Sequence, residues 1–220
     1  MPFEHRLPLA DRREAGRLLA ADLAFLRGQR DVLVLALPRG GVPVAYEIAQ
    51  ALHAPLDVFI VRKVGMPGQP EFAAGAIATG DVQVMDYTPS DVRERQRLHE
   101  MIRQETCELA RREQAYRGER PQPRLQDQVV VLVDDGLATG ATMEAAARAI
   151  RRQHPRLLVA AAPVASASAA RRLAPWVDRL VLGAQPEPFQ AVSPWYRDFP
   201  QCSDDEVCGL LSAAREGSKA

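Results

Sequence analysis

The sequence has no excess of charge of either sign. Its 28 lysine and arginine residues balance its 28 aspartate and glutamate residues, so the formal net charge is +0. A protein that holds DNA or RNA through the phosphate backbone needs a basic face. The balance therefore argues against a general nucleic-acid-binding function, and we expect no nucleic-acid partner.

Long apolar segments and a secretion signal are also lacking. The apolar runs at 32–37 and 157–164 are shorter than the ~20 residues of a membrane-spanning helix. Residues 1–6 do not have the basic segment and apolar core of a secretory signal. Cysteines are few, and Cys107, Cys202 and Cys208 fit no zinc-binding spacing. These absences predict a cytoplasmic protein with reduced thiols and no membrane partner.

The composition that remains is that of an ordinary globular protein. The chain has 220 residues, of which 47% are hydrophobic and 25% charged. A chain of this length can bury a full hydrophobic core. Because α/β domains often reach this size, we expect residues 1–220 to form a single domain.

Apolar segments alternate with helical patterns along much of the chain. We expect strands at 32–37, 57–61, 129–133, 157–164 and 179–183, and helices at 12–27, 43–52, 142–153 and 168–173. This alternation predicts an α/β fold with a parallel five-stranded sheet flanked by helices. Ligands bind such sheets at the carboxyl ends of the strands. The loops of interest are therefore 38–41, 62–68 and 134–142.

The region at about 65–125 interrupts this alternation. Residues 65–88 contain glycines, prolines and a short alternating stretch, which predicts a loop and a small hairpin. Residues 91–117 are densely charged, with acid-first pairs at i,i+4 spacing and a narrow apolar stripe. That pattern predicts a helix packed by one face. We interpret the region as an insertion within the domain.

The segment 129–142 carries the functional argument. An apolar strand ends in Asp134 and Asp135, and a loop with two glycines and two threonines then begins a helix. Glycines let backbone N–H groups converge, and the helix start adds unpaired N–H groups and a positive dipole end. The pattern predicts a phosphate site formed by Gly136, Leu137, Ala138, Thr139, Gly140, Ala141 and Thr142. A Walker loop would need a lysine, and a dinucleotide-binding loop would need a third glycine.

The same segment resembles the phosphoribosyl pyrophosphate motif of type I phosphoribosyltransferases, in which an apolar strand, two acids and a T-G-x-T helix entry follow one another. Ala138 departs from that motif, because a hydroxyl residue is frequent there. The resemblance implies the type I phosphoribosyltransferase fold with a small carboxy-terminal hood, here at about 184–216. The order and lengths of the segments resemble a bacterial subgroup predicted to be phosphoribosyltransferases.

Other positions extend the resemblance. Arg39, Gly40 and Gly41 resemble the family's pyrophosphate loop, which often contains a non-proline cis peptide, here expected at Arg39–Gly40. Lys63 matches a position where a basic residue meets pyrophosphate. The segment 189–199 resembles the base-binding hood of purine-type members. That likeness implies base contacts and a residue near the metal, and the residues concerned are Phe189, Trp195 and Tyr196 for the base and Asp198 for the metal.

The resemblance also implies a reaction. A ring nitrogen of a base displaces pyrophosphate from the sugar of phosphoribosyl pyrophosphate, with Mg²⁺ bridging the pyrophosphate and the ribose hydroxyls. The residues implied are Asp134, Asp135, Arg39 and Lys63 for catalysis, and Asp134, Asp135 and Asp198 for Mg²⁺. The implied partners are phosphoribosyl pyrophosphate and a nitrogenous base, and a homodimer is one compatible assembly.

Two other functions stay open at this point. The same fold can sense phosphoribosyl pyrophosphate or a nucleotide without turnover, and a hydrolase of the same donor is the other alternative. The intact pair Asp134–Asp135 and the loop at Arg39–Gly40 favour turnover over sensing. Neither the acceptor base nor the oligomeric state can be read from these residues.

Overall fold

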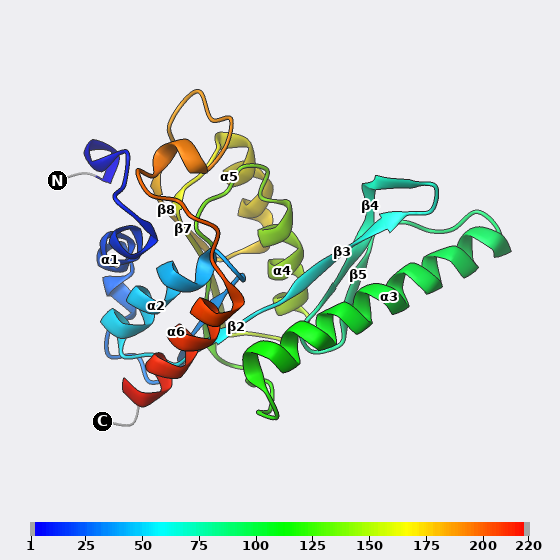
Figure 1. Cartoon of the computed structure of the whole chain (residues 1–220), viewed down its shortest axis with the longest axis horizontal. Coiled ribbons are helices and arrows are strands. Elements are labelled where there is room, and N and C mark those ends of the chain that lie inside the picture. Colours follow the sequence, from blue (N-terminus) through cyan, green and yellow to red (C-terminus); the bar gives the residue numbers. More distant parts are fainter. Residues whose placement is uncertain (1–2, 218–220) are drawn as a thin grey trace.

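A five-stranded parallel sheet forms the centre of the molecule (Figure 1). The computed structural model describes residues 3–217. The strand order is β2-β1-β6-β7-β8, and the strands are β1 (Val32–Ala36), β2 (Leu56–Val58), β6 (Val129–Val133), β7 (Leu157–Val164) and β8 (Arg179–Ala184). All four neighbouring pairs are parallel. The predicted fold class is confirmed.

Two layers of helices cover the two faces of this sheet. One layer contains α1 (Arg12–Asp22), α2 (Gly41–Leu52) and α6 (Asp204–Gly217), and the other contains α4 (Ala141–Arg151) and α5 (Ala167–Leu173). Short 3₁₀ helices lie at Phe3–Arg6, Ala24–Leu26, Ala174–Trp176 and Ser193–Trp195. Alternate residues of each strand point into different cores: Val131 packs with α2, whereas Leu132 packs with α4. This double burial explains why the strands are uniformly apolar.

The predicted insertion is an arm that stands out from the body (Figure 1). It consists of a three-stranded antiparallel sheet and one long helix, namely β3 (Val61–Met66), β4 (Gln69–Ala78), β5 (Val82–Met85) and α3 (Val92–Arg117). The predicted helix is confirmed, and β4 and β5 form a hairpin within 65–88, but the predicted loop there is wrong because most of it is strand. The glycines of this region predict a loop. Gly75 instead lies inside β4, where glycine is needed because a side chain would collide with the carbonyl of Val84.

A buried ion pair attaches the end of α3 to the body. Arg117 Nε donates to Asp57 Oδ2 of β2 at 3.2 Å, and Arg117 Nη2 donates to the carbonyl of Val58 at 3.0 Å. The Arg117 side chain is only 2% exposed. The arm is therefore held to the sheet by a buried charge that hydrogen-bonds to β2, which fixes the position of the neighbouring part of α3.

The carboxy-terminal segment divides into two parts. Helix α6 packs against α2 in the body, with Val207 and Leu211 in the core. The preceding segment runs beside the amino terminus, where Leu9 and Tyr196 form a parallel bridge. The predicted hood at 184–216 therefore includes a body helix, and the part before α6 together with the first residue of α6 lies near the predicted site. None of the helices in the described residues is long and apolar enough to span a bilayer.

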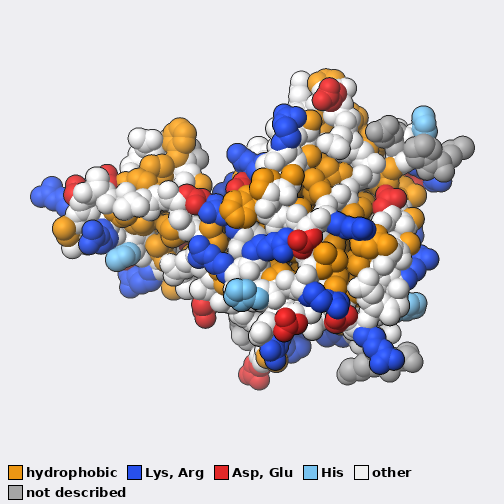
Figure 2. All heavy atoms as spheres, turned by 180° about the vertical axis from the view of Figure 1, so that it is seen from behind, with side chains coloured by type: hydrophobic (Ala, Val, Ile, Leu, Met, Phe, Trp, Pro, Cys, Tyr) orange, Lys and Arg blue, Asp and Glu red, His pale blue; other side chains and the backbone are white. Residues whose placement is uncertain are grey.

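The surface carries charges of both signs. On the face seen in Figure 2, lysine and arginine side chains lie among acidic and apolar ones, over both the body and the arm. This arrangement agrees with the balanced composition of the chain.

Candidate active site

The two aspartates lie side by side at the carboxyl end of the central strand β6. Asp134 Oδ1 accepts a hydrogen bond from the backbone N–H of Asp135 at 2.9 Å. Burial raises the pKa of Asp134 well above its usual range, and the neighbouring charge of Asp135 raises it further. Burial also raises the pKa of Asp135, against the effect of a hydrogen bond from Arg12. Two carboxylates that share so little positive charge fit a site for hydroxyl groups and a cation.

Arg12, at the start of α1, is a site residue that the sequence did not reveal. Its Nε lies 2.8 Å from Asp135 Oδ2, and its Nη1 donates to the carbonyl of Pro200 at 2.7 Å. The guanidinium carbon also lies 3.7 Å from the centre of the Phe199 ring. The helix begins at Arg12 because Asp11 accepts from the N–H of Glu14 at 2.7 Å. Arg12 and Asp135 are 123 positions apart, so no local pattern signals the pair.

The predicted phosphate loop is anchored to the end of β7. The N–H of Leu137 donates to the carbonyl of Val164 at 2.9 Å, and Ser166 Oγ donates to the carbonyl of Ala138 at 2.6 Å. Gly136 has no room for a side chain because Val192 packs against it. Gly140 adopts φ +71°, which favours glycine, and starts α4. These contacts hold the loop rigidly, and they leave Leu137 no free amide for a ligand.

The remaining loop residues have the features of the predicted anion site. Thr139 and Thr142 are exposed, and the first-turn N–H groups of α4 have no acceptor within the helix. Thr139 Oγ1 lies 3.4 Å from the N–H of Ala141. Together with the helix dipole, this geometry suits a phosphate group. The predicted phosphate role of residues 136–142 stays a prediction, with Ala138 to Thr142 as the part able to donate.

The loop at 38–41 packs directly on the aspartates. A side chain at Gly40 would overlap the carboxylate of Asp135, and one at Gly41 would lie 2.7 Å from the carbonyl of Val133. The loop contains a non-proline cis peptide, but it lies at Pro38–Arg39 and not at the predicted Arg39–Gly40. Neither bond precedes a proline, so the sequence could not distinguish them. Both glycines are required by this close approach.

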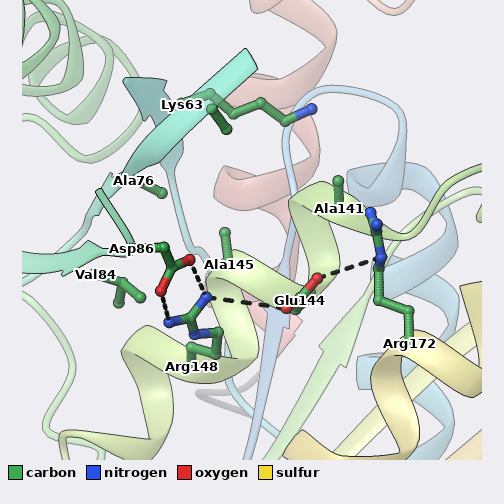
Figure 3. Close-up of a pocket in the computed structure, with 11 residues that line it drawn as sticks. Lys63, Ala76, Val84, Asp86, Ala141, Glu144, Ala145, Arg148 and Arg172 are labelled. Atoms are coloured by element: carbon green, nitrogen blue, oxygen red, sulfur yellow. Dashed lines mark hydrogen bonds and ion pairs between the residues drawn. The ribbon is translucent and has the colours of Figure 1, made fainter. Parts of the chain in front are cut away.

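The two predicted pyrophosphate cations lie in different pockets. Arg39 lines a pocket with α3 and the start of α6. Lys63 is an exposed residue of β3, and it lines a pocket with Ala141 at the start of α4 (Figure 3). In that pocket Glu144 pairs with both Arg148 and Arg172. The structure therefore places Lys63 on the phosphate side of the site, and its role toward pyrophosphate stays a prediction.

The carboxy-terminal aromatics have separate positions. Tyr196 is buried, and its hydroxyl donates to the carbonyl of Asp135 at 2.6 Å, so it supports the aspartate loop. Phe189 and Trp195 pack together with ring centres 6.0 Å apart. Asp198 is exposed and its N–H donates to Ala10. Among the described residues, no three acidic, histidine or cysteine side chains gather as a metal cluster, so Asp198 does not join the two aspartates.

Comparisons with known proteins agree with this geometry. The family model described as "Phosphoribosyl transferase domain" matches residues 12–182. A Mycobacterium tuberculosis protein named "Putative phosphoribosyl transferase Rv0571c" is 44% identical over 206 residues, which are 93% of this chain and 46% of that protein. The chain thus spans about half the length of this curated relative.

A solved structure is also similar over nearly its whole length. The crystal structure of TT1426 from Thermus thermophilus has a TM-score of 0.80 and 44% sequence identity, and the match covers 91% of this chain and 96% of that one. The family match covers well over half of the chain and includes β1, β6 and the loops at 38–41 and 134–142. The chain therefore belongs to the phosphoribosyl transferase domain family.

Proposed function

We propose that this protein is a Mg²⁺-dependent phosphoribosyltransferase, which transfers phosphoribose from phosphoribosyl pyrophosphate to a nitrogenous base and releases pyrophosphate. The observation that carries the proposal is the carboxylate pair, Asp134 and Asp135, held at a strand end beside an anion-binding helix start. The free thiols within residues 3–217 agree with a cytoplasmic location, which is part of the proposal. A homodimer stays a prediction.

The carboxylate pair would act on the sugar. In the transition state, positive charge grows on the ribose while negative charge grows on the leaving pyrophosphate. Fixed carboxylates at Asp134 and Asp135 would accept hydrogen bonds from the ribose hydroxyls and favour the positive sugar. Burial raises the pKa of both aspartates, and for Asp134 the neighbouring charge of Asp135 adds to that effect.

The phosphate loop would anchor the donor at a distance from the reacting bond. Amides between Ala138 and Thr142, together with the hydroxyls of Thr139 and Thr142, would hold the 5-phosphate. Such remote binding orients the reacting carbon without touching it. Arg39 would neutralise charge on the leaving pyrophosphate, and Lys63 is placed to add a cation near the start of α4.

The donor set fits a magnesium ion. Asp134 and Asp135 provide oxygen ligands, and Arg12 is the cation paired with them, through Asp135. Mg²⁺ usually keeps several waters and binds one or two carboxylates together with substrate phosphates, so three clustered acids are not required. When bound, the ion would be held by Asp134 and Asp135 and would supply positive charge that offsets the charge of the leaving diphosphate.

The proposal is tested by turnover. The purified protein is incubated with phosphoribosyl pyrophosphate, Mg²⁺ and a panel of nitrogenous bases, and pyrophosphate release is followed beside a double variant, Asp134→Asn with Asp135→Asn. We expect base-dependent release that falls by roughly 10²–10³ per aspartate removed. Release without any base would indicate a hydrolase, and donor binding without release would indicate a sensor; either outcome would contradict the proposal.

A further inference from the structure

A polar pocket of about 440 Å³ opens beside the loop at 38–41. It lies between the carboxy-terminal half of α3 and the first residue of α6. Its lining consists of Pro38, Arg39, Arg111, Arg112, Tyr116 and Asp204. This pocket gives a role to the charged helix α3, which the proposed reaction does not use.

Positive charge exceeds negative charge in this lining. Three guanidinium groups face the single carboxylate of Asp204. Arg39 Nη1 is 3.8 Å from Asp204 Oδ1, which is too far for a hydrogen bond. The hydroxyl of Tyr116 donates to the same oxygen at 2.6 Å. Asp204 is therefore a partial counter-ion, held in place from α3.

The two arginines of α3 keep donors available. Arg111 Nε and Arg112 Nε both bind Glu108, at 2.7 and 2.8 Å. A guanidinium has five N–H groups, so one carboxylate shared by two arginines leaves several unused. The side chains of Arg111 and Arg112 are 63% and 33% exposed, and both can reach a ligand in the pocket.

The position of the pocket links it to the sugar site. Pro38 and Arg39 line the pocket, while the next residue, Gly40, packs against the carboxylate of Asp135. The loop therefore lies between the aspartate pair and the arginine cluster. Pro38 and Arg39 thus belong both to the loop beside the aspartates and to the wall of this pocket.

We propose that Arg111 and Arg112 join Arg39 in a binding site for a diphosphate group, and that this group displaces Asp204 as the counter-ion of Arg39. Planar guanidinium groups match phosphate oxygens through paired hydrogen bonds. Glu108 and Asp204 together carry less charge than the three guanidinium groups, whereas a diphosphate carries several negative charges. That the diphosphate belongs to phosphoribosyl pyrophosphate, and not to free pyrophosphate, rests on the proposed function.

The test is calorimetric titration with inorganic pyrophosphate, orthophosphate and phosphoribosyl pyrophosphate, each with Mg²⁺. The variants are Arg111→Ala, Arg112→Ala and Asp204→Asn. Arg103→Ala is the matched control, because Arg103 is an exposed arginine of α3 paired with Glu100 at i−3, away from the pocket. Alanine preserves the helix, and thermal unfolding shows that each variant is folded.

We expect each arginine variant to weaken pyrophosphate binding roughly tenfold, which is typical of losing a charge-assisted hydrogen bond. Asp204→Asn should tighten binding several-fold, because it removes a competing negative charge, and Arg103→Ala should change nothing. Orthophosphate should bind at least tenfold more weakly than pyrophosphate, and the arginine effects should shrink at high salt.

Two results would overturn the inference. One is that both arginine variants bind pyrophosphate and the donor as tightly as the wild type does; the other is that the wild type binds orthophosphate as tightly as pyrophosphate.

Failure of this inference can be distinguished from failure of the proposed function. If the donor binds and turns over with unchanged affinity in the arginine variants, the diphosphate site fails and the transferase stands. If pyrophosphate binding depends on the arginines but the donor is not used, the transferase fails and the site stands.

Discussion

Two carboxylate sites in the same sheet are compensated differently. Asp57 in β2 accepts hydrogen bonds from the N–H of Val58 at 2.7 Å and from Arg117 at 3.2 Å. Arg117 also donates to the carbonyl of Val58. At the end of β6, by contrast, Arg12 is the one basic side chain in residues 3–217 that forms an ion pair with either aspartate, and it contacts only Asp135.

The difference separates a structural charge from a functional one. A buried carboxylate that is paired with its own cation fixes geometry and needs no ligand. A carboxylate pair with raised pKa values is unfavourable for the protein alone, and perturbed pKa values of this kind concentrate at functional sites. We therefore interpret Asp57–Arg117 as the anchor of the arm, and Asp134–Asp135 as the site that a ligand completes.

The largest expected effect comes from breaking the anchor. Arg117→Ala leaves the carboxylate of Asp57 buried without its cation, so the free energy of unfolding should fall by about 3–5 kcal/mol. Chemical denaturation measures this loss. Arg103→Ala on the same helix, an exposed residue, should change stability by less than about 0.5 kcal/mol. Similar small losses for both variants would show that the anchor is not structural.

The next effect concerns the one cation at the functional pair. Arg12→Ala removes a hydrogen bond to a charged group and should lower the free energy of unfolding by about 1.5–3 kcal/mol. In an Asp135→Asn background the same change should cost less, because no carboxylate is left uncompensated. A double-mutant cycle measures the difference. A cycle with no coupling energy would mean that Arg12 acts only through Pro200 and Phe199.

The close approach of the loop at 38–41 gives a smaller effect. Gly40→Ala places a methyl group against the carboxylate of Asp135, so we expect a stability loss of about 1–3 kcal/mol together with weaker donor binding. Gly209→Ala is the control, because nothing lies within 4 Å of that position in α6. Thermal unfolding and donor titration should distinguish the two variants. A Gly40→Ala protein with the stability and donor affinity of the wild type would contradict the packing described.

The smallest effect is a pH dependence at the joint between arm and body. A hydrogen bond from Arg148 of α4 lowers the pKa of Asp86, which follows β5. A lowered folded-state pKa contributes stability above the unfolded value of roughly 4, and this contribution is lost as the pH falls through the folded value. Asp86→Asn should therefore reduce stability slightly at pH 7, and the reduction should shrink as the pH falls below roughly 4. The side chain is exposed, so the effect is small.

Local patterns predicted the body of the fold well. Strand β6 was predicted residue for residue because its apolar run is continuous and ends in acids, and the helix after it begins at a glycine. The arm was predicted less well, since β3 leaves the body only two residues after β2 ends, and no residue marks that change. The partners Arg12–Asp135 and Arg117–Asp57 are pairings between distant segments, which no periodicity encodes.

The most direct test of the account is Asp134→Asn, followed by both unfolding and donor titration at pH 7. A carboxyl whose folded-state pKa is raised destabilises the protein once the pH exceeds its unfolded value, so removing the charge should increase the free energy of unfolding without ligand. The same change should sharply weaken Mg²⁺-dependent binding of phosphoribosyl pyrophosphate. A less stable variant with unchanged donor affinity would contradict the assignment of this carboxylate pair to a ligand.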